Sequence, residues 1–186
     1  MRVPRLTIRF APIRFPMMLA VFLWTLGAAL APALTFAQPG DAQIPGSGPV
    51  HDRAAIHAAA RQWITAFKAG DLDALVRLYD PDAYVALHDQ PALRGIDAIR
   101  DYFAPRVGQG KVEFLLDIER IEVTGRTAHL ISGYWFTMQL PGKPEYRDAG
   151  RSLLIYRKSR SGQWRIHVDI DQGTPDIAFP PPPGAR

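Results

Sequence analysis

Residues 70–89 read GDLDALVRLYDPDAYVALHD, and this stretch predicts how the folded domain begins. Gly70 follows an apolar helical pattern and Asp71 precedes a second one, as a glycine after one helix and the N-cap of the next would. Residues 80–82 (Asp-Pro-Asp) have the composition of a turn, and the apolar run at 83–88 predicts a strand. The expected order is therefore helix, helix, turn and strand.

The aspartates of this stretch have two interpretations. Asp71, Asp73, Asp80 and Asp82 could supply the oxygen ligands of a metal ion. Each also has a local structural role, since the first two suit the start of a helix and the last two flank a turn proline. We favour the structural roles, so we expect no metal site, and no motif elsewhere indicates a cofactor.

The pattern on either side extends this prediction to an α+β domain. Upstream, apolar residues recur at helical spacing from 56 to 67, with Asp52 as the expected N-cap. Downstream, a short helix follows Gly95, and strands are expected at 111–123, 127–140, 145–158 and 163–171. Three helices followed by a meander predict helices packed on one face of a curved antiparallel sheet.

The positive charge of the chain comes from its N-terminus. The formal net charge is +4, but residues 1–37 hold four arginines and no acidic residue, so the remainder is balanced. This distribution argues against a nucleic-acid-binding surface. An apolar run at 17–30 and small residues before Ala37 predict a signal peptide, residues 1–37, and a periplasmic or secreted protein. Cleavage after Ala33 and a retained membrane anchor are the alternatives, although the run is shorter than the ~20 residues of a spanning helix.

Proline and glycine mark the limits of the domain. Residues 38–50 read as a linker, 51–175 as the folded domain, and 176–186 as a proline-rich tail. The sequence contains no cysteine, which excludes disulfides and thiol chemistry.

Three segments resemble one known family. They are WITAFKAGDLDALVRLYDPDAYV (63–85), LRGIDAIRDYF (93–103) and GRSLLIYRKSRSGQWRIHVDI (150–170). They are similar to the SnoaL-like branch of the nuclear-transport-factor-2-like superfamily. The resemblance implies a cone in which three helices close a bent sheet around a deep apolar pocket. That superfamily includes ketosteroid isomerase, scytalone dehydratase and pure binding domains, so the resemblance leaves the activity open.

The resemblance also places two residues at positions important in ketosteroid isomerase. The position of the general base is occupied by Leu87, and that of the oxyanion tyrosine by Trp63. Leucine cannot take a proton, which argues against steroid-isomerase chemistry. His88 and Asp89 follow directly, either as a base with a neighbouring carboxylate or as a solvated loop before Pro91.

The last strand carries the second candidate group. His167, Asp169 and Asp171 alternate with apolar residues, and the resemblance places all three on the pocket face. Neighbouring side chains on one face are about 7 Å apart, which is long for three ligands of one metal ion and suits acid–base or hydrogen-bonding roles. The alternatives are a solvated face, or Asp169 paired with Arg151 or Arg165.

The sequence therefore supports three hypotheses. The first is a pocket that binds a small hydrophobic molecule, and the second is a lyase, isomerase or hydrolase acting on such a molecule. The third is a homodimerisation module, and a homodimer is also the expected assembly, with no membrane partner after signal cleavage. The candidate catalytic residues are His88, Asp169 and His167. The N–H of Trp63 and the side chain of His167 are expected to orient the substrate. The candidate ligand-binding residues are Trp63, Phe67, Val85, Leu87, Phe103 and Asp171.

Overall fold

The computed structural model describes residues 45–183. The predicted signal peptide and the predicted linker as far as residue 44 lie outside the described residues. Within the described part of the chain, no helix has both the length and the apolar character needed to cross a membrane.

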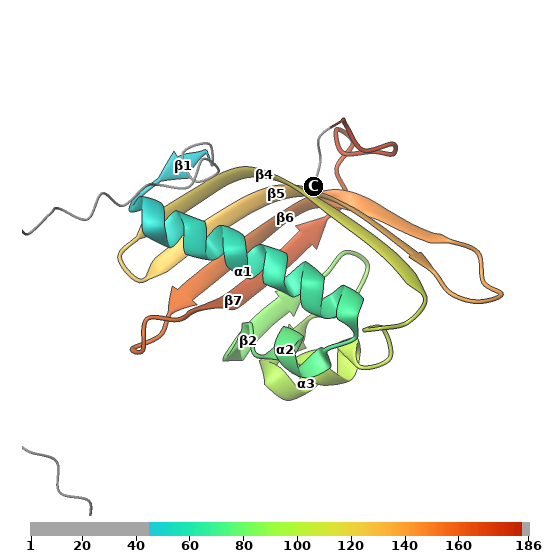
Figure 1. Cartoon of the computed structure of the whole chain (residues 1–186), viewed down its shortest axis with the longest axis horizontal. Coiled ribbons are helices and arrows are strands. Elements are labelled where there is room, and N and C mark those ends of the chain that lie inside the picture. The colour runs from blue at the N-terminus through green and yellow to red at the C-terminus, as the bar shows by residue number, and fades with distance from the viewer. Residues whose placement is uncertain (1–44, 184–186) are drawn as a thin grey trace, which may run out of the picture. The chain divides into compact units, whose positions relative to one another are not determined.

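A curved seven-stranded sheet forms the larger layer of the domain (Figure 1). The strands, in sheet order β1-β4-β5-β6-β7-β2-β3, are Gly46–Ser47, Lys111–Thr124, Thr127–Gln139, Tyr146–Lys158, Trp164–Gln172, Tyr79–Ala86 and Leu93–Arg94. The predicted antiparallel meander from β4 to β7 is confirmed. Two pairings make the expected antiparallel sheet a mixed one, since β1 runs parallel to β4 and β2 runs parallel to β7.

Three helices form the second layer and confirm the predicted α+β class. They are α1 (Val50–Ala69), α2 (Leu72–Val76) and α3 (Gly95–Phe103). The long helix α1 lies across the sheet, while α2 and α3 sit beside β2 (Figure 1). The two helices α1 and α2 are separated by Gly70, whose φ of 76° suits glycine and lets the chain reverse within one residue. Buried apolar side chains of the helices pack against the strands as one core.

Residues 70–89 agree with the sequence prediction at the start of α2 and differ from it at residues 80–82. Asp71 caps α2 and accepts a hydrogen bond of 2.8 Å from the Ala74 amide. Residues 80–82, predicted as a turn, lie within β2. The pairing of β2 with β7 is irregular between Tyr79 and Tyr84, which accommodates a proline without a ladder hydrogen bond.

The predicted N-cap role of Asp52 is wrong. Helix α1 begins at Val50 after Pro49, so Asp52 lies in the first turn and its side chain turns inward. The carboxylate accepts hydrogen bonds from Lys158 Nζ at 2.7 Å and Trp164 Nε1 at 3.2 Å. Asp52 therefore ties the start of α1 to β6 and β7.

The segments predicted as a linker and as a tail both contact the sheet. β1, within the segment predicted as a linker, pairs with Ile121 and Glu122 of β4. Beyond residue 175, Asp176 forms an ion pair with Arg151 at 2.8 Å. The Ala178 carbonyl accepts a hydrogen bond of 2.8 Å from the Trp135 indole. The folded unit thus begins before residue 51 and continues past residue 175.

Candidate functional site

A cavity of about 310 Å³ lies between α1, α3 and the concave face of the sheet. Its lining comes from both helices, from strands β4 to β7 and from the loop after β2. Most predicted site residues line it, namely Trp63, Phe67, Leu87, His88, Phe103, Asp169 and Asp171. Val85 and His167 do not. Val85 is fully buried where α3 packs on β2, so its role is in the core.

Aromatic rings form the inner wall of the cavity. Trp63 stacks on Phe67 with ring centres 5.3 Å apart, and the edge of Phe103 meets Trp63 at 5.7 Å. Phe114 and Phe136 of the sheet complete this group. Such a wall favours a ligand with a flat apolar body.

Asp169 is the polar group of the inner wall, and its residue is only 8% exposed. The Tyr79 hydroxyl donates a hydrogen bond of 2.9 Å to Asp169 Oδ2, and Trp63 Nε1 donates one of 2.9 Å to the Tyr79 oxygen. The expectation that Trp63 offers its N–H to a ligand is therefore wrong, because that N–H holds Tyr79.

Neither arginine considered as a partner of Asp169 pairs with it. Arg151 is bound to Glu119 and Asp176, and Arg165 donates to Gln163. Burial raises the pKa of Asp169, the Tyr79 hydrogen bond lowers it, and the negative charge of Asp171 raises it, so that the pKa is about 7. A carboxyl group with this pKa exchanges its proton near neutral pH.

We expect Tyr79→Phe to raise the pKa of Asp169 still further, by about one pH unit, because a hydrogen bond to the charged form is lost. The matched control is Tyr156→Phe. The Tyr156 side chain is also buried near Asp169, but its hydroxyl has no hydrogen-bond partner among the described residues. The measurement is a ¹³C NMR titration of the aspartate carboxyl carbons. An unchanged midpoint in Tyr79→Phe would show that this hydrogen bond does not set the pKa.

Polar residues surround the opening of the cavity. We call His88, Tyr102, Tyr134, Tyr146, Asp148 and Asp171 the mouth. The His88 amide donates to Asp171 Oδ1, and the His88 ring nitrogen Nδ1 lies 3.4 Å from Asp148 Oδ1. The Tyr134 hydroxyl donates to Asp148 Oδ2 at 3.2 Å. His88 therefore lies in the exposed loop after β2, as one alternative expected, and still lines the cavity, whereas Asp89 does not line it.

The sequence prediction missed Asp148, although a signal for it existed. Asp148 shares its strand face with Ser152 and Leu154, which both line the cavity. Counting alternate residues back from Leu154 would have placed it there. Burial raises the pKa of Asp171, and the charge of Asp148 raises it further, against the opposing hydrogen bond from His88.

The prediction that His167 lines the pocket is wrong because β7 contains a bulge. Ile155 of β6 pairs with Val168, but Tyr156 pairs with Ile166, so His167 is an extra residue. The bulge shifts the alternation by one, and Ile166, Asp169 and Asp171 all face the cavity. His167 lies outside it.

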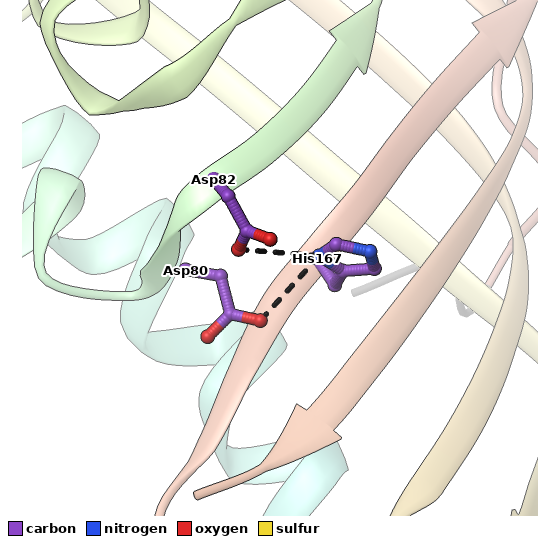
Figure 2. Close-up of side chains that lie close together, drawn as sticks. All are labelled: Asp80, Asp82 and His167. Carbon is purple, nitrogen blue, oxygen red and sulfur yellow. Dashed lines mark ion pairs between the residues drawn. The ribbon is translucent and has the colours of Figure 1, made fainter.

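His167 instead meets two acidic side chains of β2 (Figure 2). Its Nδ1 lies 3.5 Å from Asp80 Oδ2 and 3.7 Å from Asp82 Oδ1, and its Nε2 lies 2.5 Å from Arg157 Nη2. The predicted turn roles of Asp80 and Asp82 are thus replaced by ion pairs between neighbouring strands.

These three residues present ligand atoms within 4.8 Å of one another, a spacing that a metal ion could use. The Arg157 guanidinium, however, lies 3.6 Å from Asp80 and 3.5 Å from Asp82 and already supplies positive charge. The group is therefore explained as an ion-pair network joining β2, β6 and β7, away from the cavity.

Comparisons with known proteins agree with this architecture. Residues 49–168 match the SnoaL-like domain. A ketosteroid isomerase-like protein from Erwinia carotovora atroseptica SCRI1043 is 23% identical, with a TM-score of 0.56 over 63% of this chain and 92% of that one. A candidate dehydratase of the nuclear transport factor 2-like family from Streptomyces avermitilis is 18% identical, with a TM-score of 0.60 over 69% of this chain and 99% of that one.

A third structure has the same fold. It is a candidate scytalone dehydratase from Novosphingobium aromaticivorans DSM 12444, 16% identical, with a TM-score of 0.62 over 67% of this chain and 85% of that one. At these identities the likeness concerns the fold alone. No curated protein is similar enough to the chain to count as a match.

Proposed function

Because this chain belongs to the family of SnoaL-like domains, we propose that its cavity binds a small apolar molecule and that Asp169 moves a proton on it. The observation that carries the proposal is the state of Asp169. Its carboxyl group has a pKa of about 7, lies in an aromatic cavity of about 310 Å³, and is held by Tyr79. A base of this strength is well matched to proton transfer at neutral pH.

The proposed step is removal of a proton from a carbon atom of the ligand. Asp169 Oδ1 takes the proton, the C–H bond breaks, and its electron pair remains on the ligand. Asp169 Oδ2 keeps its hydrogen bond from Tyr79, which Trp63 holds in turn. Tyr79 and Trp63 are therefore positioning residues, and Asp169 is the catalytic residue.

Two of the proteins with the same fold bear names that fit this reaction class. Isomerases and dehydratases commonly begin with removal of a proton from carbon, and the similar structures include a ketosteroid isomerase-like protein and a candidate scytalone dehydratase. In this chain Leu87, at the position of the isomerase base, lines the cavity but cannot accept a proton. The base is therefore expected on β7.

The test uses 2-tetralone, a small bicyclic ketone with acidic C–H bonds, in D₂O. We expect the purified protein to accelerate deuterium incorporation next to the carbonyl. The protein-dependent rate should rise about tenfold per pH unit up to about pH 7 and then level off. NMR integration against a protein-free reaction measures it. If the protein does not accelerate deuterium incorporation, the cavity only binds ligands and does not catalyse proton transfer. A rate independent of pH across this range would rule out Asp169 as the base.

We also propose homodimerisation and export as properties of this chain. On the outer face of the sheet, Leu153 pairs across strands with Ile131 and Ile170. Leu153 is 37% exposed and Ile170 is 39% exposed, and this apolar row supports a contact with a second copy. The arginines and apolar run of residues 1–37 support export.

A further inference from the structure

We propose that the mouth binds a positively charged group, so that the ligand is an amine with an apolar body. The inference rests on the proposed function, because the apolar body would occupy the same cavity. It adds the chemical class of the polar end, which the family does not specify.

Two carboxylates at the mouth supply the negative charge. Asp148 and Asp171 are both held by His88, through its ring and its backbone amide respectively. The Asp148 side chain is 20% exposed, so it is oriented but still reachable from the cavity. Two fixed, partly buried carboxylates can share one ammonium group and its several N–H donors.

Three tyrosines line the cavity together with these carboxylates. Burial raises the pKa of Tyr102, Tyr134 and Tyr146, and the charges of Asp148 and Asp171 raise each of them further. Among these pairs, the Tyr134 hydroxyl donates a hydrogen bond directly to Asp148 Oδ2. Aromatic rings attract cations through the negative potential of their faces, and rings combined with carboxylates are typical of ammonium-binding sites.

The cationic side chains of the cavity do not cancel this charge. Arg106 is the arginine of the lining, and its guanidinium carbon lies 3.9 Å from the centre of the Tyr102 ring. Its Nη1 also donates to the Tyr102 carbonyl at 2.5 Å. Arg106 thus already occupies one face of the Tyr102 ring, so Tyr134 and Tyr146 are the rings proposed to meet the ligand's cation. Together with Asp169 on the inner wall, the lining contains three carboxyl groups. Its basic side chains are those of Arg106 and His88.

The geometry therefore selects between ligands of similar shape and different charge. A carboxylate ligand would meet Asp148 and Asp171 and be repelled, and a neutral one would add no positive charge to the hydrogen bonds that His88 and Tyr134 already supply. An ammonium ligand would be favoured over both while its apolar body packs on the aromatic wall.

Three naphthalene probes test this selection because they share a ring system. They are 2-naphthylmethylammonium, 2-naphthylmethanol and 2-naphthoate, titrated into the purified protein at pH 7.5 and low ionic strength. We expect the ammonium to bind at least tenfold more tightly than the alcohol, and the carboxylate to bind most weakly. Added salt should reduce the preference.

Asp148→Asn should lower the preference for the ammonium over the alcohol, taken as the ratio of their two affinities for the same variant, to about threefold or less. The matched control is Asp117→Asn, which removes the same charge from an exposed position of β4 on the opposite face of the sheet. It should keep the preference of the unmodified protein. Retention of the full preference in Asp148→Asn would overturn the assignment.

The outcomes separate this inference from the proposed function. If the alcohol binds as tightly as the ammonium, or the carboxylate binds best, the cation site is wrong and the apolar pocket stands. If none of the three probes binds, both the pocket and the cation site fail.

Discussion

Asp169→Asn is expected to lower deuterium exchange into 2-tetralone by roughly 10²–10⁴-fold and, at pH 8, to make the protein more stable. The loss of activity follows because an amide cannot accept the proton. The amide oxygen can still accept the Tyr79 hydrogen bond, so the site keeps its shape. The two effects have one origin, which is a carboxylate kept in an apolar cavity at the expense of stability.

The stability effect depends on pH in a defined direction. The pKa of Asp169 is about 7 in the folded protein and near its ordinary 3.8 in the unfolded chain. The folded state therefore binds the proton more tightly, and stability falls as the pH rises from about 4 to about 7. Above pH 7 the loss of stability reaches its full value. A pKa difference of three units between the folded and unfolded states corresponds to about 4 kcal/mol, which is an upper bound. Because the buried amide has its own cost, we expect a net gain of about 2 kcal/mol.

Urea unfolding at pH 8 and pH 4.5 measures this difference. Asp169→Asn should be more stable than the unmodified protein at pH 8 and should lose that advantage at pH 4.5. Asp117→Asn makes the same change at an exposed position. It should change the free energy of unfolding by no more than about 0.5 kcal/mol at either pH. A stability gain of equal size at both pH values would contradict the assigned pKa.

Asp52→Ala is expected to lower the free energy of unfolding by about 2–3 kcal/mol at pH 7. The change leaves the Lys158 ammonium and the buried Trp164 indole without their shared acceptor. It also removes a negative charge from the first turn of α1, where it interacts favourably with the helix dipole. The start of the helix would lose its attachment to β6 and β7.

The pH dependence of this effect has the opposite sign to that of Asp169. The hydrogen bond from Lys158 lowers the pKa of Asp52, with Trp164 and the Lys158 charge acting in the same direction against burial. Its stabilisation is therefore fully present above about pH 4 and is lost as the pH falls through the lowered pKa. Urea unfolding at pH 7 and pH 3 should show the deficit shrinking in acid.

Asp97→Ala is the control for this experiment, since Asp97 is an exposed carboxylate in the first turn of α3. It should cost no more than about 1 kcal/mol. An equal loss in both variants would mean that the helix dipole, and not the buried contact, accounts for the effect of Asp52.

The fold could be predicted because its signals are local. Gly70 and Asp71 separate two helices through backbone conformation and a single cap, both readable from neighbouring residues. The meander follows from alternation and turn glycines. The parallel pairing of β2 with β7 could not be predicted, because it joins segments about 85 residues apart and leaves no periodic pattern in the sequence.

The residues of the site could be predicted where strand alternation holds, and the prediction failed where a bulge interrupts the alternation. Asp169 and Asp171 were placed in the pocket correctly, whereas His167 was misplaced by the bulge. Asp52 was misassigned for a related reason. Its residue type suits an N-cap, but a lysine and a tryptophan more than a hundred residues later determine where its side chain lies.

The bulge in β7 determines how variant libraries of this protein should be built. A library that randomises every second codon from Ile166 would alter the cavity at Ile166 but the outer surface from Val168 onward. The alternation has to be shifted by one residue after His167, so that positions 166, 169 and 171 vary together as one wall. Deleting His167 would have the reverse use, since it would remove the extra residue and restore regular alternation while shortening the strand by one residue. Ligand preference and surface properties can thus be evolved separately on a single strand.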